Sequence, residues 1–151
     1  MLADLFTFLT TADTSGLDSD RAAAIALVRS MIGRSDAAPG QTPWAMYPGT
    51  LAEGAELPAL SCTLISDSIQ HQISGEDIGL YHTRVQIDAW SQLMDEMEAL
   101  AAAVTTSLDG FIGIMVSTEV QLVEATNSID TFEPGRLQYR RSLDFIIHHG
   151  V

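Results

Sequence analysis

The stretch YHTRVQIDAW, residues 81–90, alternates two kinds of side chain with a period of two. Successive side chains of an extended strand point to opposite faces, so this pattern predicts a strand. One predicted face, which suits a core, carries Tyr81, Val85, Ile87 and Ala89. The other carries His82, Arg84, Gln86, Asp88 and Trp90. The sequence leaves open whether this second face meets solvent, a ligand or another protein.

A second stretch, YRRSLDFIIHH at residues 139–149, has a related pattern. Arg140 and Asp144 stand four residues apart, as Arg84 and Asp88 do, so each pair projects to one face of its strand. If the two strands are sheet neighbours, the charges can pair across the ladder, each pair contributing roughly 0.2 to 1 kcal/mol. A solvated face with ion pairs is one interpretation. A protein interface is the other, because Trp90 shares the face.

The candidate interface residues are therefore Arg84, Asp88, Trp90, Arg140 and Asp144.

Length and charge limit the possible classes. The chain of 151 residues is long enough to bury a core, and we expect a single domain. The net charge is −13 and all seven basic residues are arginine, which argues against nucleic-acid binding through a basic face. An acidic surface keeps a protein soluble, and it also suits a wall past which DNA moves without sticking.

The sequence favours a soluble, intracellular protein without redox chemistry. No apolar run reaches the ~20 residues that span a bilayer. The first residues, MLADLFTFLTTAD, lack the basic segment of a secretory signal. Cys62, the single cysteine, lies in the apolar run LSCTLIS and is interpreted as a buried structural thiol.

Periodicity predicts three helices and a long connection. The first helix covers residues 2–9, and the second begins at Asp18 or Ser19 as its cap and stops at Gly33. Residues 35–58 contain four of the five prolines, which indicates an extended connection with little regular structure. The side chains expected to pack onto the domain from this connection are those of Trp44, Met46 and Tyr47.

Alternation predicts four strands. The first begins at Ala59, a loop follows over residues 66–79, and the 81–90 strand returns as an antiparallel hairpin. A helix capped by Ser91 follows, with an apolar stripe made by Leu93, Met97, Leu100, Ala101, Val104 and Leu108. Strands over 115–125 and 137–149 complete the chain. The order predicts an α+β fold, a mainly antiparallel sheet of about four strands packed against helices.

For the last two strands, the alternation also predicts which residues share one face. Val116, Thr118, Val120 and Leu122 are expected on one side of the third. The predicted apolar face of the last carries Leu137, Tyr139, Leu143, Phe145 and Ile147.

Signals of enzymatic chemistry are weak. The histidines have no acidic or cysteine partner at metal-ligand spacing, and none of the common nucleotide-binding, hydrolase or metalloprotease motifs occurs. Neighbouring acids, such as Glu76 with Asp77 or Asp95 with Glu96, are usually solvated. We therefore expect no catalytic residue, no cofactor and no metal.

Four segments together resemble the tail terminator proteins, also called tail completion or head-to-tail joining proteins, of long-tailed phages and related prophage elements. The segments are YPGTLAEGAELPALSCTLIS, GEDIGLYHTRVQIDAW, the acidic and apolar helix ending in LDG, and YRRSLDFIIHH. In that family a YP…LP segment precedes the first strand, and an R-V-Q-I-D strand follows a glycine-containing lead. The resemblance covers about residues 43–149, and residues 1–42 form an additional helical segment and linker.

The resemblance implies a non-enzymatic virion assembly protein. Such proteins form a ring, usually a hexamer, on the head-proximal end of the tail tube, where they end tube polymerisation. The implied partners are further copies of the chain, the tail tube protein and the head–tail connector proteins, and DNA passes through the lumen without specific binding. The implied location is the head–tail interface of the virion, after assembly in the bacterial host cytoplasm, with no membrane involved.

Two alternatives stay open at the level of sequence. The chain could be a tail tube or head–tail connector subunit, which open-ended polymerisation or closed rings would distinguish. It could also be a small-molecule-binding or enzymatic α+β domain with a pocket beneath the 66–80 loop. Convergent polar groups with perturbed titration at that place would favour this last alternative.

Overall fold

The computed structural model describes residues 1–34, 39, 43–51, 53–71 and 77–150, with only the backbone of residues 71, 77 and 78. Its helices are α1 (Leu2–Thr10), α2 (Ser19–Ile32) and α3 (Met94–Leu108). Its strands are β1 (Met46–Pro48), β2 (Ala59–His71), β3 (Asp77–Ser91), β4 (Gly113–Met115), β5 (Thr118–Glu133) and β6 (Gln138–Gly150).

The strands form one six-stranded sheet in the order β1-β2-β3-β6-β5-β4. The four long strands are antiparallel to their neighbours, and β1 is parallel to β2. The predicted α+β fold with a mainly antiparallel sheet is confirmed, but the sheet has six strands rather than about four. The additional strands, β1 and β4, have three residues each, too few to produce a recognisable alternation.

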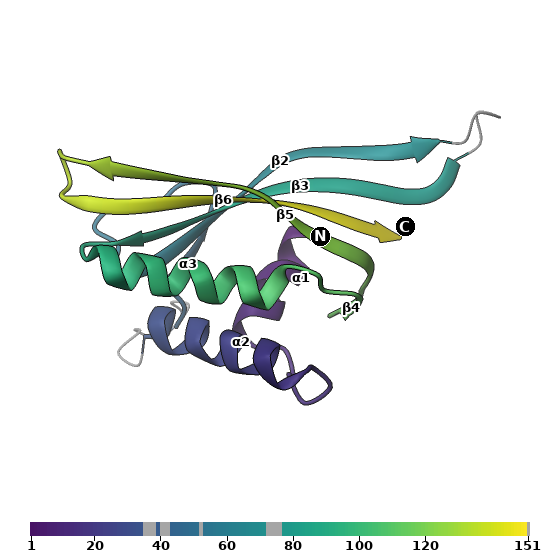
Figure 1. Ribbon diagram of the computed structural model, residues 1–151, viewed down its shortest axis with the longest axis horizontal. Coiled ribbons are helices and arrows are strands. Elements are labelled where there is room, and N and C mark those ends of the chain that lie inside the picture. The colour runs from purple at the N-terminus through teal and green to yellow at the C-terminus, as the bar shows by residue number, and fades with distance from the viewer. Residues whose placement is uncertain (35–38, 40–42, 52, 72–76, 151) are drawn as a thin grey trace.

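Helices cover one face of the sheet (Figure 1). We call this the inner face and the uncovered side the outer face. Helix α3 packs directly on β3, β5 and β6, and α2 packs beneath α3. The fully buried apolar side chains on the inner face of the central strands are Val85, Ile87, Ala89, Phe145 and Ile147. The two sides predicted for residues 81–90 thus correspond to the two faces of β3.

Both hairpins are longer than their sequence patterns indicated. The predicted loop over 66–79 is wrong for most of its length, because β2 continues to His71 and β3 begins at Asp77. Strand β5 likewise continues to Glu133. The far end of the β2–β3 hairpin extends past the helices (Figure 1), and residues 64–70 of β2 and 124–130 of β5 are exposed on both faces of the sheet. Strand segments without a core face need no apolar alternation, which explains why Ser66, Asp67 and Ser68 suggested a loop.

Two predicted strands begin in the wrong place. The predicted 115–125 strand is divided by a tight turn in which Val116 has a φ of 59°, so β4 ends at Met115 and β5 begins at Thr118. Leu137, expected on an apolar face, has a φ of 52° and is 69% exposed just before β6. Positive φ values are uncommon for such side chains, and a pattern of residue types does not reveal them.

The other apolar residues predicted for these strands differ in how far they are buried. Val120, Leu143, Phe145 and Ile147 are buried, as expected. Tyr139 is partly buried at the end of the sheet, where its ring contacts Phe132 with centroids 4.9 Å apart.

The second helix begins and ends where its caps predicted. The Oδ1 of Asp18 accepts the backbone N–H of Arg21 at 2.9 Å, and Gly33 follows the last turn. Helix α3 differs, because Leu93 and not Ser91 occupies its N-cap position. The Oγ of Ser91 accepts the N–H of Leu93 at 3.1 Å and lies 2.6 Å from Glu96 Oε1. Ser91 therefore ties the end of β3 to α3, and Leu93, predicted in the apolar stripe, is 63% exposed.

The connection before β2 holds regular structure that its prolines concealed. The expectation of little regular structure over 35–58 is wrong at residues 46–48, which form edge strand β1. Proline is tolerated in an edge strand because one side of that strand needs no ladder hydrogen bonds. Met46 is buried and Trp44 and Tyr47 are half-buried, as predicted. Most of residues 35–42 lie outside the described part of the chain.

Cys62 lies on the inner face of β2 and is fully buried. Burial, and secondarily the negative charge of Asp88, raises the pKa of its thiol to about 12. The interpretation as a structural thiol is consistent with this environment, because the reactive species is the thiolate. In the described part of the chain, no helix combines the length and apolar character needed to cross a membrane.

Candidate functional site

The five predicted interface residues lie together on the outer face of β3 and β6. These strands are antiparallel neighbours in which Trp90 stands opposite Arg140 and Asp144 stands opposite Gln86. The condition set by the sequence pattern, that the two charged strands be adjacent, is therefore fulfilled. No helix formed by the described residues lies over this face (Figure 1).

Arg84 and Asp144 form the cross-strand ion pair. The Nη2 of Arg84 donates to Asp144 Oδ2 at 2.8 Å. The Asp144 side chain is only 12% exposed, whereas that of Arg84 is 49% exposed. The second oxygen, Asp144 Oδ1, is buried and has no hydrogen-bond partner among the described residues. Arg84 thus supplies the compensating charge for a carboxylate that is largely removed from water.

Trp90 and Arg140 form the second contact. The guanidinium carbon of Arg140 lies 5.2 Å from the centre of the Trp90 indole, in a cation–π arrangement. The indole Nε1 donates to Ser61 Oγ at 3.0 Å, and Trp90 is only 5% exposed. Arg140 also lies 3.8 Å from Glu133 at the end of β5. This part of the outer face is therefore shielded by its own side chains.

Asp88 pairs with neither arginine. Its Oδ1 accepts the side-chain N–H of Gln86 at 3.0 Å, and the residue is 7% exposed. The contacts described for these five residues thus lie within the chain, and their role between subunits stays a prediction. What the structure establishes is a charged and aromatic patch with restrained side chains.

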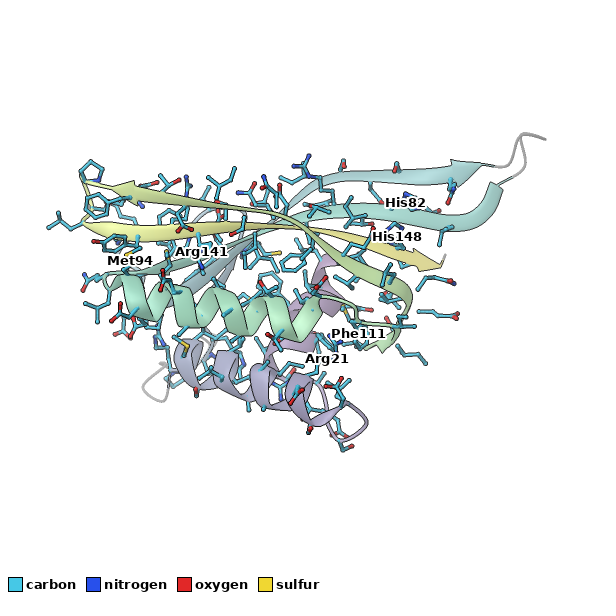
Figure 2. All side chains as sticks on the ribbon, viewed as in Figure 1. Arg21, His82, Met94, Phe111, Arg141 and His148 are labelled. Atoms are coloured by element: carbon cyan, nitrogen blue, oxygen red, sulfur yellow. The ribbon has the colours of Figure 1, made fainter. Side chains whose placement is uncertain are left out.

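The rest of the outer face is hydrophilic and carries little net charge. Its neutral polar residues are Ser61, Thr63, Ser66, Ser68, Gln70, Gln86, Asn127, Thr131, Gln138 and Ser142. Its described arginines are two, Arg84 and Arg140, and its described carboxylates are Asp88, Glu119, Glu124, Glu133 and Asp144. His82 and His148 stand side by side there, with ring centroids 4.4 Å apart (Figure 2). Most of the net charge of −13 therefore lies elsewhere on the molecule.

A second cluster lies at the inner face where β2, β3 and β6 extend past α3. The Oγ1 of Thr83 lies 2.8 Å from Asp67 Oδ1 and 2.7 Å from His149 Nε2. The other ring nitrogen, Nδ1, lies 2.9 Å from the carbonyl oxygen of Gly150. The sequence analysis missed this cluster because the residues come from three strands. The available signal was Thr83, a polar residue on the core-facing side of the 81–90 pattern.

Hydrogen counting shows what this cluster requires. The Gly150 carbonyl and an ionised Asp67 can only accept, and the Thr83 hydroxyl carries one hydrogen. All three contacts form together when both nitrogens of His149 carry protons, or when Asp67 is protonated instead. Thr83 is fully buried, so its hydroxyl is not accessible as a nucleophile. The cluster is therefore suited to joining three strands and not to attacking a substrate.

Two open grooves lie at the inner side of the sheet. One, of about 590 Å³, lies beside the cluster and is lined by Met1, Asp67, Tyr81, Ser117, Thr118, Glu119, His149 and Gly150. This groove lies where the alternative of a small-molecule-binding or enzymatic domain places its pocket, beneath residues 66–80. The other, of about 510 Å³, lies between α3 and the β5–β6 pair.

The second groove ends at Arg141, which reaches from β6 toward α3 (Figure 2). Its guanidinium donates to both oxygens of Asp130, at 2.6 and 2.9 Å, and lies 3.7 Å from Glu98 of α3. The hydrogen bond and the positive charge lower the pKa of the Asp130 carboxyl. Arg141 is thus occupied in holding the sheet against α3. Within the described residues, no three His, Cys, Asp or Glu side chains are grouped so as to hold a metal ion.

Comparison with known proteins gives a structural relative. No sequence profile of a protein family matches the chain, and no curated protein matches it. Among solved structures, the chain is similar to a chain of the virion of a native gene transfer agent (GTA) particle, with a TM-score of 0.54 and 14% sequence identity. The similarity covers 91% of this chain and 90% of that chain. It shows that this α+β fold, including its helices, is shared with a chain of that virion.

Proposed function

We propose that the protein is a non-enzymatic virion component that forms a ring at the head-proximal end of a phage-type tail. There it ends the polymerisation of the tail tube and joins the tail to the head connector. The observation that carries the proposal is the fold shared with a chain of a GTA virion over nine-tenths of both chains. The tail terminator resemblance of residues 43–149 refines that general class to a specific position in the particle.

The sheet itself supports assembly into a ring. Its two outermost strands, β1 and β4, are short, so long parts of β2 and β5 have no strand beside them. Open sheet edges favour pairing with another chain. A head-to-tail contact between different surfaces of identical subunits closes into a ring if its rotation closes. A ring built in this way leaves no sheet edge exposed.

The outer face is suited to line a conduit for DNA. Its neutral polar side chains and excess of carboxylates over arginines offer little for phosphate to bind. In this arrangement the ends of the ring contact the tail tube protein and the head–tail connector proteins. Assembly then takes place in the bacterial host cytoplasm, and the finished protein resides at the head–tail interface.

Native mass spectrometry and negative-stain electron microscopy test the proposal. The purified protein, alone and with its cognate tail tube protein, should form closed rings of one size. We expect six copies in each ring. Added rings should bind one end of the tubes and stop their growth. Monomers under conditions in which the tube protein assembles would contradict the proposal. Open-ended polymers of the chain itself would identify a tube subunit, and rings that bind only the head portal would identify a connector subunit.

A further inference from the structure

The two edges of the sheet have complementary outlines. On one edge, β1 pairs with β2 only along Leu60–Cys62, and β2 continues to residue 71. On the other, β4 pairs with β5 only along Thr118–Val120. Backbone hydrogen bonds from residues 110 and 111 extend that cover as far as Val123. Each edge therefore has a covered end and an open end.

Strand register shows that the covered end of one edge is level with the open end of the other. Ser61 pairs with Asp88, Asp88 with Ser142, and Ser142 with Ile129. Tyr47 of β1 pairs with Ser61, so it is level with Ile129 in the open part of β5.

The same tracing relates β4 to the open part of β2. Ile69 pairs with Tyr81, which pairs with His149, and His149 pairs with Val120. Gly113 of β4 pairs with Val120, so β4 is level with Ile69. Residues 63–68 of β2 separate the level of β1 from that of β4. β1 of one copy and β4 of the neighbouring copy can therefore lie end to end between the two copies without overlapping.

Strand directions also match. The strands β2, β3, β6 and β5 alternate in direction, so β5 of one copy and β2 of the next run in opposite directions. Because β4 is antiparallel to its own β5, it is parallel to the β2 that it meets in the next copy. Because β1 is parallel to its own β2, it is antiparallel to the β5 that it meets in the neighbouring copy. Pro48 has no N–H, so at that position only its carbonyl can join this ladder. The antiparallel ladder is the slightly more stable of the two pairings.

Exposed apolar side chains mark the proposed contact. Ile129 is 56% exposed in the open part of β5, and Tyr47 is half-buried on β1. Both point to the outer face, because their partners across the sheet, Ser61 and Ser142, do so. Directly opposed side chains on one face of an antiparallel pair contact each other. The contact between two copies would cover both.

We infer that copies of this chain join edge to edge, with β1 of one copy pairing with β5 of the next and β4 pairing with the next copy's β2. The inference rests on the proposed ring and specifies its subunit contact. The same contact repeats around the ring and produces one continuous sheet. The patch formed by Arg84, Asp88, Trp90, Arg140 and Asp144 lies away from this contact, on the outer face of the central strands.

Disulfide trapping with the double variant Tyr47→Cys, Ile129→Cys tests the contact. Within one chain, β2, β3 and β6 separate the two positions, which places them roughly 19 Å apart at the usual strand spacing. No disulfide spans that distance, so every cross-link joins two copies. Cys62 is buried and does not compete. Mild oxidation should give a ladder of covalent oligomers that ends at the number of copies in the ring.

A matched control replaces Tyr47→Cys by Leu27→Cys, because Leu27 is 45% exposed on α2 and belongs to neither edge. This control should give no ladder. Native mass spectrometry of the reduced variants shows separately whether rings form. Closed rings without a ladder from the first variant would overturn the edge contact and leave the ring function intact. Only monomers from the unmodified chain, with tube protein present, would overturn the ring and the contact together.

A second pair of variants tests the contact without cysteine. Ile129→Lys places a charge in the open edge, and it should raise the concentration needed for ring formation at least roughly tenfold. Leu137→Lys is the control, because Leu137 is 69% exposed in the same hairpin but precedes β6 outside the edge. Equal effects of the two changes on ring formation would overturn the inference. Thermal unfolding of both variants checks that the monomer remains folded.

Discussion

The two faces of strands β3 and β6 bury their side chains by different means. On the inner face, Ile87 and Phe145 are fully buried beneath helices. On the outer face, Trp90, Asp88 and Asp144 are 5%, 7% and 9% exposed although no helix of the described segments lies over them. Their cover comes from neighbouring side chains on the same face, through the contacts of Arg84, Arg140, Gln86 and Ser61.

The inner face therefore mainly provides stability, whereas the outer face mainly determines how the surface side chains are arranged. Inner-face burial is non-directional and scales with apolar area removed from water. Outer-face burial depends on directional contacts between charged, aromatic and amide groups, which restrain side chains before any partner arrives. Restrained side chains would lose less conformational entropy on association if this face meets a partner.

The largest expected effect comes from the inner face. Phe145→Ala removes a fully buried aromatic ring and should lower the free energy of unfolding by about 3–5 kcal/mol. The adjacent Ile146→Ala is the matched control, because Ile146 is only partly buried on the outer face. Denaturant unfolding followed by circular dichroism measures both. Equal losses would show that the two faces contribute alike to stability.

The polar cluster at the inner face should give an intermediate effect. Thr83→Val keeps the shape of the side chain but removes the hydroxyl that contacts Asp67 and His149. The expected loss is about 1–3 kcal/mol, because His149 stays largely buried without this hydrogen bond, whereas the exposed Asp67 can bond to water instead. Thr131→Val on the outer face is the control for the change of residue type. A loss no greater than that of the control would show that the cluster does not join the three strands.

Charge reversals on the outer face test whether the patch contacts another protein in addition to its contacts within the subunit. Arg140→Glu should lower the free energy of unfolding by about 1 kcal/mol or less, as expected for a partly exposed ion pair. Arg84→Glu should cost more, about 1–3 kcal/mol, because it leaves the largely buried Asp144 carboxylate without its compensating charge. If the patch contacts another protein, ring formation or binding of the tube protein should weaken further. Native mass spectrometry beside thermal unfolding separates the two quantities. If both variants simply unfold, the pairs serve only the subunit itself.

The smallest expected effect concerns Asp4, which joins α1 to the turn between β4 and β5. Its Oδ2 accepts hydrogen bonds from Thr118 Oγ1 at 2.7 Å, Ser117 Oγ at 2.7 Å and Ser117 N at 3.1 Å, and these bonds lower its pKa. The carboxylate therefore contributes stability above its unfolded-state pKa, and this contribution is lost as the pH falls through the lowered folded-state value.

The variant Asp4→Ala should consequently be less stable than the wild type at neutral pH, and the difference should disappear in strong acid. Unfolding measured between pH 7 and pH 2 checks this dependence. Asp20→Ala, which removes an exposed acid in the first turn of α2, is the control. A difference that stays constant with pH would show that the carboxylate charge is not involved.

Local patterns predicted the central part of the fold because each strand there has one buried face. Val85, Ile87 and Ala89 alternate with polar residues since α3 covers only one side of β3. The same alternation placed Arg84 with Asp88 and Arg140 with Asp144, and it allowed these charges to pair if the two strands were neighbours. Arg84 does pair with Asp144, whereas Asp88 accepts from Gln86 and Arg140 lies near Glu133. The partner of each charge was not predictable, because Arg84 meets Asp144 diagonally through the register of two strands 60 residues apart.

The ends of the sheet were not predictable from these patterns. Where β2 and β5 are exposed on both faces of the sheet, the alternation is lost, so Ser66–Ser68 suggested a loop. The turn at Val116 depends on a positive φ that favours other residue types. The three-residue strands β1 and β4 exist only because a longer neighbour offers hydrogen bonds.

The sequence by itself therefore determined the α+β class, the helix caps at Asp18 and Gly33, and the two chemically distinct faces of the central strands. Propensity, capping and alternation are local properties, and neighbouring residues are sufficient to express them. Only the tertiary structure decided the number of strands, the Asp67–Thr83–His149 cluster and the level at which β1 and β4 cover opposite edges. These features depend on register between distant strands, which is set when the sheet closes around its core.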